Sequence, residues 1–266
     1  MADDAQQSIS LSIVIPAYNE AHRLPASLEL ARVFLDSSEL NAEVLVVDDG
    51  SEDGTASVVE EAQQDWPALK LLRQAHAGKG AAVRLGVAHA VGEQIALADA
   101  DFSMPITEFR RFTPDALDKY DIAIASREAP GARRYGEPEY RHIMGRVFNR
   151  LVQWLLLPGI EDSQCGFKFL RRAVAQDIIQ QLTIDGWGFD VELLYIARRH
   201  GYQIREIGVP WRYGSDSRVS PLRDTLTMIR DIGIVWLNSR KGRYDPLPTA
   251  GKNHIASDTT PAARRS

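Results

Sequence analysis

Residues 43–55 read EVLVVDDGSEDGT, an acidic turn that follows directly on a short run of apolar, mostly β-branched residues. Such a run, bounded by turn-forming residues, is typical of a strand that is buried on both faces of a parallel sheet. In an open α/β sheet, the ligand crevice forms at the carboxyl ends of the strands. The stretch therefore predicts both a buried strand and a binding site at its end, where Asp48 and Asp49 stand.

The same alternation of short apolar runs and longer helical patterns continues on both sides of this stretch. A strand is expected at 11–18 (LSIVIPAY), and helices are expected through 27–35 and 56–64. The other elements expected in the first half are strands at 69–74, 93–101 and 121–127, a helix that begins in AGKGAAV (77–83), and a short helical stretch around Phe109. This βαβα order predicts an α/β fold with a mostly parallel central sheet covered by helices.

The pattern changes after Arg127. A polar loop is expected at 128–139 (EAPGARRYGEPE), and a helix at 140–157 follows it. The remaining expected elements are the GFKFL segment (166–170), helices at 172–182 and after GWGFD (186–190), a strand near 203–211 and a final helix at 221–238. We expect one domain over residues 10–240, a flexible segment at 1–9 and a disordered tail at 245–266.

The composition excludes several classes of protein. Of 266 residues, 44% are hydrophobic and 25% are charged, which argues against a wholly disordered, collagenous or coiled-coil chain. The 31 basic and 36 acidic residues give a net charge of -5, so no nucleic-acid partner is expected. The single cysteine, Cys165, excludes an intramolecular disulfide framework and a cysteine-rich zinc site. With no secretory signal in MADDAQQSIS and no apolar stretch of about 18 residues, a cytoplasmic location is expected.

A second acidic pair, Asp99 and Asp101, ends the strand expected at 93–101. If the backbone stays extended, residues i and i+2 point to the same side, so the two carboxylates converge. Mg²⁺ and Mn²⁺ prefer one or two such carboxylates, with water and phosphate oxygens completing the shell. The alternative is that these are ordinary turn acids, and Asp48 has a similar alternative as a helix cap.

Two glycines flank Lys79 in the segment HAGKGAAVRLG, at the beginning of an expected helix. Exposed N–H groups and a lysine attract an anion there. The spacing is not G-x-x-x-x-G-K-[ST], and no G-x-G-x-x-G follows the first strand, so the fingerprints of a Walker ATPase and of a dinucleotide enzyme are both missing. Carboxylates and a metal that face a diphosphate remain the best interpretation.

Four ordered segments resemble the family 2 glycosyltransferases with a GT-A fold: IPAYNE (15–20), VVDDGSEDGT (46–55), AGKGAAVRLG (77–86) and ADADFSMP (98–105). Further on, IEDSQCGFKFL (160–170) and WGFDVELLYIARRHGYQIREI (187–207) resemble the dolichyl-phosphate β-glucosyltransferase branch. The resemblance covers about residues 10–240. It implies a nucleotide-diphospho-sugar transferase fold, with a donor half at about 10–127 and an acceptor half at about 128–240.

The resemblance also implies a reaction and a set of site residues. The expected reaction inverts the anomeric carbon of a hexose, most simply glucose from UDP-glucose, and uses Mg²⁺ or Mn²⁺ held by Asp99 and Asp101. The acceptor is expected to be dolichyl or polyprenyl phosphate, and Arg127 is the first candidate to bind its phosphate. The expected catalytic residues are therefore Asp99, Asp101 and Arg127. The residues expected to bind substrate are Pro16, Ala17, Tyr18, Glu20, Asp48, Asp49, Lys79, Gly80, Asp99, Ala100, Gln164 and Lys168.

Several alternatives stay open at this point. Mannose from GDP-mannose, or transfer to a glycan hydroxyl, requires the same metal acids. A hydroxyl acceptor would also need a base, for which Asp162 and Asp190 are the first candidates, although Asp190 also suits a helix cap. A protein of another class, a catalytically silent binder of nucleotide sugar or lipid phosphate, is disfavoured by the intact Asp99 and Asp101. Other phosphate-binding candidates in the acceptor half are Arg133, Arg134, Arg141 and Arg146.

Two expected helices carry apolar residues at helical spacing beside basic ones, which indicates possible peripheral contact with a membrane. The helix at 140–157 has Ile143, Val147, Leu151 and Trp154 or Leu155, with Arg141, Arg146 and Arg150 nearby, and the final helix has Leu222, Leu226, Ile229 and Trp236 before SRKGR (239–243). The alternative is that both stripes face the core of the protein itself.

Overall fold

The computed structural model describes residues 9–38, 40–112, 119–214 and 221–246, without the side chains of 221–225. Its centre is a sheet in the order β3-β2-β1-β4-β7-β5-β8. All neighbouring strands are parallel except β7, which runs antiparallel to β4 and β5. The strands are β1 (Leu11–Ala17), β2 (Ala42–Asp48), β3 (Leu69–Arg73), β4 (Gln94–Leu97), β5 (Ile122–Ser126), β7 (Lys168–Arg171) and β8 (Ile204–Gly208).

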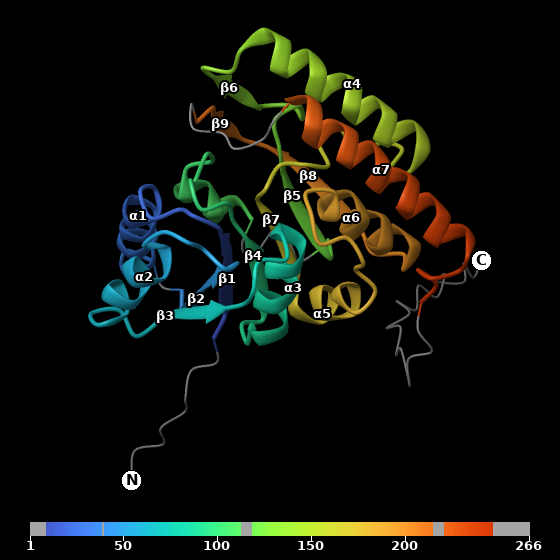
Figure 1. Ribbon diagram of the computed structural model, residues 1–266. Helices are drawn as coiled ribbons and strands as arrows, with labels where there is room; N and C mark the ends of the chain where they lie inside the picture. Colours follow the sequence, from blue (N-terminus) through green and yellow to red (C-terminus); the bar gives the residue numbers. More distant parts are fainter. Residues whose placement is uncertain (1–8, 39, 113–118, 215–220, 247–266) are drawn as a thin grey trace, which may run out of the picture.

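Helices cover both faces of this sheet (Figure 1). One face is covered by α1 (Leu24–Asp36), α2 (Thr55–Gln63) and the short 3-10 helix η1 (Ile106–Arg111). The other face is covered by α3 (Lys79–His89), α5 (Arg172–Ile179) and α6 (Phe189–Arg199), and the layer is extended by α4 (Glu139–Leu155) and α7 (Pro221–Arg240), which lie side by side. The predicted α/β class with a mostly parallel, covered sheet is confirmed.

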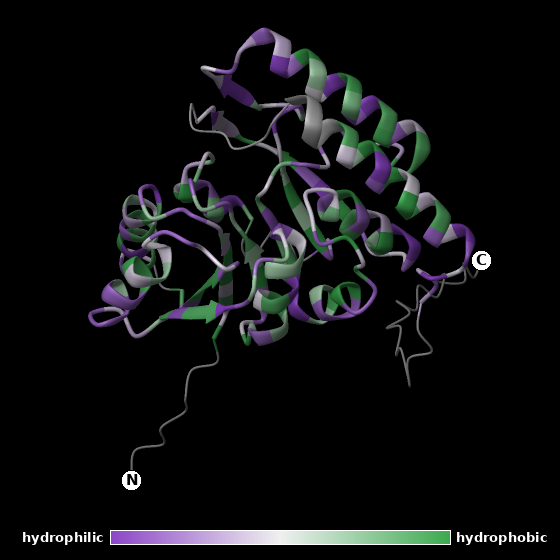
Figure 2. Cartoon of the chain, in the orientation of Figure 1, coloured by the Kyte–Doolittle hydropathy of each residue, from purple (hydrophilic) through white to green (hydrophobic). Residues whose placement is uncertain are grey.

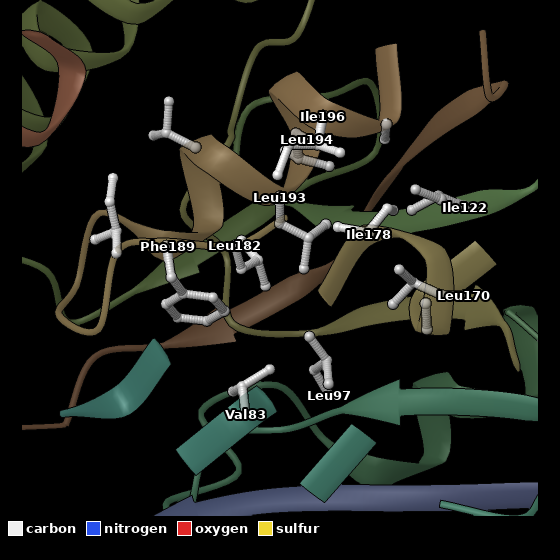
Figure 3. Close-up of a cluster of buried hydrophobic side chains, with 14 of the residues drawn as sticks. Val83, Leu97, Ile122, Leu170, Ile178, Leu182, Phe189, Leu193, Leu194 and Ile196 are labelled. Carbon is white, nitrogen blue, oxygen red and sulfur yellow. The ribbon is translucent and has the colours of Figure 1, made fainter. Parts of the chain in front are cut away.

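The sheet is apolar on both faces, and this is why its strands are nearly continuous hydrophobic runs (Figure 2). In β2, Val44 and Val46 join the core under α1 and α2, whereas Leu45 and Val47 join the core under α3. Figure 3 shows part of this second core, in which Val83 of α3, Leu97 of β4 and Leu193 of α6 lie among neighbouring side chains from the sheet and from α5. The two cores fix the strand register, because a one-residue slip would exchange the two faces.

One predicted loop is partly wrong. Within 128–139, residues Arg133–Tyr135 form β6, which pairs in parallel with β9 (Pro210–Arg212) in a small second sheet. The two paired strands are far apart in the chain: Arg133 of β6 lies opposite Pro210 of β9, more than seventy residues later. Local sequence pattern carries no signal for such a pairing, because β6 is short and its side chains are polar or exposed.

The folded region also extends beyond the predicted boundary at residue 240. Tyr244 is fully buried, and its hydroxyl donates a hydrogen bond to Glu192 Oε1 at 2.5 Å. The backbone carbonyl of Asp245 accepts a hydrogen bond from Gln181 Nε2 at 3.1 Å. The predicted flexible segment 1–9 and tail 245–266 otherwise lie outside the described residues. Among the described residues, no helix is both long enough and apolar enough to cross a membrane.

The close approach of α3 to the sheet depends on Gly86, and this generates a prediction. A methyl group on Gly86 would overlap the side chain of Val14 in β1 and press on Val47 in β2. We expect Gly86→Ala to lower the free energy of unfolding by about 1–3 kcal/mol through overpacking. Gly233→Ala is the matched control, because that helical glycine has open space around it and alanine favours the helix. Urea unfolding measures both; equal stability of the two variants would contradict this packing.

Candidate active site

A cavity of about 650 Å³ opens at the carboxyl edge of the sheet, a size that suits a small-molecule ligand. The loops that follow β1, β2 and β4 form one part of its wall. The other part comes from α4, β9, α7 and the segments around residues 164–166 and 186–190. The predicted site residues that line the cavity are Pro16, Ala17, Tyr18, Glu20, Asp49, Lys79, Asp99, Ala100, Asp101, Arg127 and Gln164.

Asp49 organises the loop that precedes α3. Its buried carboxylate accepts hydrogen bonds from the backbone N–H groups of Ala77 and Gly78, each at 2.9 Å, and contacts His76 Nδ1 at 2.8 Å. The His76 ring stacks on Tyr18, with 4.1 Å between the ring centroids. The loops after β1, β2 and β3 are therefore held together around one carboxylate, and an aromatic pair stands at the cavity wall.

Lys79 and Asp99 form an ion pair inside the cavity. The Lys79 ammonium lies 2.6 Å from Asp99 Oδ1, and the rings of Trp187 and Phe189 lie 5.1 and 5.7 Å from it. Burial alone would lower the pKa of Lys79, but the neighbouring Asp99 carboxylate raises it; Lys79 in turn lowers the pKa of Asp99 against the opposing effect of burial. Both groups are therefore charged at neutral pH.

The expected geometry of the second acidic pair is wrong in one respect. Strand β4 ends at Leu97, and Asp99 and Asp101 lie in a turn in which Phe102 N–H donates to the Asp99 carbonyl. Phe102 has φ +42°, so the backbone is not extended. The turn nevertheless brings both carboxylates to the cavity. Asp101 Oδ1 accepts hydrogen bonds from the N–H and hydroxyl of Ser103 at 3.0 and 2.8 Å, which hold it in place.

Sequence comparison identifies the family. The model of Glycosyl transferase family 2 matches residues 12–179. The chain is a family 2 glycosyltransferase. Among its relatives, the dolichyl-phosphate beta-glucosyltransferase of Drosophila melanogaster is 32% identical over 259 residues, which cover 89% of this chain and 77% of that protein. The protein of the same name from Mus musculus is 35% identical over 251 residues, covering 88% and 77%.

Solved structures establish the GT-A fold of this glycosyltransferase. Mycobacterium tuberculosis glucosyl-3-phosphoglycerate synthase, in complex with Mn²⁺, uridine diphosphate and phosphoglyceric acid, has a TM-score of 0.64 at 18% identity, covering 89% of this chain and 80% of that one. Mannosyl-3-phosphoglycerate synthase from Rubrobacter xylanophilus also gives 0.64 at 18% identity, covering 90% and 77%. The fold that the motifs predict is thus confirmed.

Three residues that were predicted to bind substrate do not line the cavity: Asp48, Gly80 and Lys168. Asp48 is buried, and its Oδ1 accepts a hydrogen bond from Ser51 N–H at 3.1 Å, as in the capping alternative. The N–H groups of Gly80 and Ala81 donate to the Asp185 carbonyl, so this helix start does not offer them to an anion. The anion-binding capacity predicted here therefore rests on the charge of Lys79.

Lys168 is the third of these residues. Its fully buried ammonium donates to Asp190 Oδ1 at 2.6 Å and to the Cys165 carbonyl at 2.7 Å. Asp190 lines the cavity, so Lys168 orients a wall residue from behind. Burial raises the pKa of the Cys165 thiol to about 12, and the thiol is therefore a packed group and no nucleophile at neutral pH.

The guanidinium of Arg127 faces the cavity but is already engaged. Its Nε and NH2 atoms pair with the two oxygens of Asp162 at 2.7 and 2.8 Å, and it lies over the Trp211 ring at 5.3 Å. The bidentate edge that we expected to hold acceptor phosphate is thus occupied by Asp162. Although burial by itself raises the pKa of the Asp162 carboxyl, Arg127 lowers it to about 2. A carboxylate with such a pKa is a poor general base.

The other arginines that were candidates for phosphate binding differ in whether they reach the cavity. Arg134 and Arg141 line the cavity, whereas Arg133 and Arg146 do not. Glu128, which the sequence analysis did not select, holds both Arg134 and Arg146, at 2.6 and 2.7 Å. His76, Arg23, Ser103, Trp211 and Tyr213 are also cavity residues that the sequence analysis did not select. Of these, Ser103 lies within the ADADFSMP motif and His76 directly precedes the AGKG segment.

Gly166 is another residue whose role becomes visible only in the structure. It lies against the carboxylate of Asp99, and a methyl group at this position would overlap both Asp99 oxygens. The glycine in the CGFK segment therefore leaves the space in which Asp99 sits beside Lys79. The segment thus shapes the acidic end of the cavity from the start of β7, the strand that neighbours β4.

The buried Arg127–Asp162 pair generates a pH prediction. The carboxyl of Asp162 has a pKa of about 2 in the folded protein, against an ordinary value of 3.8. A lowered folded-state pKa stabilises the protein above the unfolded value, so this contribution is complete above about pH 5 and is lost as the pH falls through 4 to 2. We expect it to amount to about 2.5 kcal/mol, measured by urea unfolding across that range.

The double variant Arg127→Met/Asp162→Asn is the control for this prediction, since it removes both charges. It should lose about 2 kcal/mol less than the wild type between pH 5 and 2, because Asp162 is still half ionised in the folded wild type at pH 2. The single variant Asp162→Asn leaves a buried arginine without its counter-ion, and should cost about 3–5 kcal/mol at pH 7. A wild type and double variant with the same pH slope would refute the assignment.

Proposed function

We propose that this glycosyltransferase transfers glucose from UDP-glucose to dolichyl phosphate or another polyprenyl phosphate, inverting the anomeric carbon. The observation that carries the proposal is the two-ended cavity: an acid and lysine end at the edge of the sheet, and an arginine and aromatic end beside α4 and α7. The relatives named dolichyl-phosphate beta-glucosyltransferase, 32% and 35% identical, support a glucosyl group as the one transferred and dolichyl phosphate as the acceptor.

The sheet edge suits the nucleotide diphosphate. The stacked Tyr18 and His76 rings present an aromatic surface for a base, beside the loop that Asp49 holds. The Lys79 ammonium lies next to the rings of Trp187 and Phe189, so its positive charge is partly desolvated and available to a phosphate oxygen. These groups bind and orient a donor without a Walker motif.

Asp99 and Asp101 fit a divalent cation. Both carboxylates reach the same cavity, and among the described residues no cluster of three or more His, Cys, Asp or Glu side chains offers an all-protein metal cage. Mg²⁺ and Mn²⁺ accept one or two carboxylates and take their remaining ligands from water and phosphate oxygens. When bound, the ion neutralises charge on the departing diphosphate. Gly166 and Ser103 hold the two carboxylates in position for it.

The other end of the cavity suits an acceptor that is already an anion. A phosphate nucleophile needs no general base, which agrees with Asp162 being committed to Arg127 and Asp190 to Lys168. Arg127 keeps the outer part of its guanidinium toward the cavity, and Arg134 and Arg141 line the same wall. Their charge favours binding of the acceptor phosphate and its attack on the face opposite the leaving group. A cytoplasmic location, with peripheral contact to the membrane, stays a prediction.

The test is a product assay with purified protein. UDP-glucose, UDP-galactose and GDP-mannose are each supplied with Mg²⁺ or Mn²⁺, with and without a polyprenyl phosphate, and nucleotide release and lipid product are measured. We expect UDP release from UDP-glucose that depends on the lipid, and a glucosyl lipid with a β-linkage by proton NMR. Asp101→Asn should reduce turnover by about 100-fold or more, because it weakens the proposed metal site.

Each contrary result identifies a different error. A product formed only from GDP-mannose would overturn the donor, and transfer to a glycan hydroxyl would overturn the acceptor. Binding of UDP-glucose without any transfer would favour a silent binding protein. Asp53→Asn is the matched control for Asp101→Asn: Asp53 is an acidic loop residue that binds Ala21 and Thr55 backbone groups and does not line the cavity.

The Lys79–Asp99 pair generates a separate prediction about the metal. Because Lys79 neutralises Asp99 at 2.6 Å, it competes with a cation for the same carboxylate. Lys79→Met should tighten Mn²⁺ binding to the nucleotide-free protein by about tenfold, and should weaken UDP binding. The EPR signal of free Mn²⁺ measures the first effect, and calorimetry measures the second.

Lys70→Met is the control for this experiment. Lys70 pairs with Glu43 at 2.7 Å, a similar separation, but neither residue lines the cavity. It should leave the affinities for Mn²⁺ and UDP unchanged. If Lys79→Met also leaves the Mn²⁺ affinity unchanged, Asp99 is not a metal ligand in the nucleotide-free protein.

A further inference from the structure

Helix α4 exposes an apolar stripe to solvent. Ile143, Val147 and Trp154 are 62%, 63% and 80% exposed, and Tyr140 continues the stripe toward the start of the helix. These positions recur at intervals of three, four and seven residues, so they share one side of the helix. The side chains that α4 buries, Phe148, Asn149 and Val152, lie on the opposite side. The stripe therefore faces away from the core of the domain.

Helix α7 repeats this arrangement. Among its described side chains, Leu226, Ile229, Trp236 and Leu237 are exposed, and they recur at helical spacing. The same helix buries Ile232 and Val235 on its other side. The alternative interpretation, in which the apolar stripes of both helices face the core, does not hold for these residues. The predicted Leu151 is only partly exposed, and the side chain of Leu222 lies outside the described residues.

Helices α4 and α7 lie side by side (Figure 1) and contact each other, so their exposed apolar stripes belong to the same part of the molecular surface. Hydrophobic bands recur along both helices in Figure 2. We name this surface the α4–α7 platform, and it consists of Tyr140, Ile143, Val147, Trp154, Leu226, Ile229, Trp236 and Leu237. A contiguous exposed apolar surface of this kind marks an interaction site.

Positive charge accompanies the platform. Arg150 is exposed on α4 between Val147 and Trp154, and Arg240 lies over the Trp236 ring at 4.0 Å. Lys241 and Arg243 follow directly after α7. An apolar helix face with arginine, lysine and tryptophan at its margin is the composition of a helix that lies in the interface of an anionic bilayer.

The two helices that carry the platform also wall the cavity. The same two helices contribute Met144, Gly145, Phe148 and Asn149 from α4, and Met228 from α7, to the cavity wall. These residues lie on the inner sides of the two helices, so a bilayer that contacts the outer sides lies one helix diameter, about 10 Å, from the cavity.

We propose that the α4–α7 platform binds the surface of an anionic lipid bilayer and so presents the acceptor phosphate to the cavity. The second half of this statement rests on the lipid acceptor proposed above, whereas binding of the platform to a bilayer does not. A second copy of the chain fits the surface less well, because a symmetric pairing would bring Arg150 and Arg240 of each copy toward a surface of like charge.

The first experiment measures binding to vesicles without any acceptor or nucleotide. Full-length protein is sedimented with phosphatidylcholine vesicles containing about 30% phosphatidylglycerol, and with pure phosphatidylcholine vesicles. The variant Ile143→Ser/Val147→Ser/Trp154→Ser should reduce the partition coefficient on anionic vesicles by about tenfold or more. Arg150→Gln should reduce it by about fivefold on anionic vesicles and leave binding to neutral vesicles unchanged.

The matched control replaces exposed apolar residues elsewhere. Leu30→Ser/Val33→Ser on α1 removes side chains that are 55% and 57% exposed, on a helix far from the platform in Figure 1. It should bind vesicles as the wild type does. Circular dichroism and the unfolding midpoint verify that all variants remain folded, which is expected because every substituted side chain is exposed.

The second experiment separates this proposal from the proposed reaction. With a short, water-soluble prenyl phosphate, the triple serine variant should keep wild-type turnover, since Ile143, Val147 and Trp154 do not line the cavity. With a long polyprenyl phosphate in anionic vesicles, its turnover should fall by about tenfold. If the wild type binds vesicles but makes no glucosyl lipid, the proposed reaction fails and the membrane surface stands.

Three results would overturn the membrane surface. The wild type would fail to sediment with anionic vesicles, or the triple serine variant would sediment as the wild type does. In the third case, light scattering would show a wild-type dimer that the triple serine variant converts to a monomer. That result would assign the α4–α7 platform to contact between two copies of the chain.

Discussion

The register of β1 against its two neighbours decides where the acidic end of the cavity lies. Strand β1 pairs with β2 as far as Ala17 opposite Asp48, but it pairs with β4 only as far as Val14 opposite Leu97. Strand β4 therefore stops three residues short of the edge that β1 and β2 reach. The turn that carries Asp99 and Asp101 occupies the space that a longer β4 would fill. The cavity is thus a product of unequal strand length at a parallel sheet edge.

The charged groups around this edge are arranged as matched pairs. Lys79 faces Asp99, Arg127 faces Asp162, and Lys168 faces Asp190. Desolvated single charges would be costly, and pairing with an opposite charge reduces that cost. The pairs differ in access, since Lys168 is wholly buried whereas Lys79 and Arg127 line the cavity. Of these three cations, only Lys79 and Arg127 can be reached by an anion in the cavity. Lys168 therefore has a structural role, whereas Lys79 and Arg127 are available for binding.

The sequence predicts the central sheet well and the cavity wall in part, for identifiable reasons. Buried parallel strands are continuous apolar runs, so β1, β2, β4 and β5 are readable from local pattern. The pairing of β6 with β9 and the antiparallel insertion of β7 depend on contacts between distant segments, which no local pattern records. The motif acids Asp99 and Asp101 reach the cavity as predicted, although through a turn and not through an extended strand.

Motif membership and cavity contact also separate at particular residues. Asp48 and Asp49 are adjacent in one motif, yet only Asp49 lines the cavity: Asp48 is the last residue of β2 and accepts a hydrogen bond from Ser51 N–H, whereas Asp49 follows the strand. Lys168 lies in the same segment as Gln164, but the strand β7 turns its side chain into the protein toward Asp190. A motif identifies the backbone segment near the site, whereas burial and pairing decide which of its side chains reach a ligand.

The two ends of the cavity are built from different elements. This difference matters for the proposed reaction, in which a water-soluble donor meets a lipid acceptor. The donor end is built on strand ends clamped between two buried cores, which hold its geometry with little freedom. The acceptor end is walled by α4 and α7, whose inner sides belong to the core and whose outer sides are apolar and exposed. A surface that is apolar on both sides can contact protein on one and lipid on the other. In the proposed reaction, a cavity at the junction of these two supports is where a nucleotide sugar meets a phosphate at a bilayer surface.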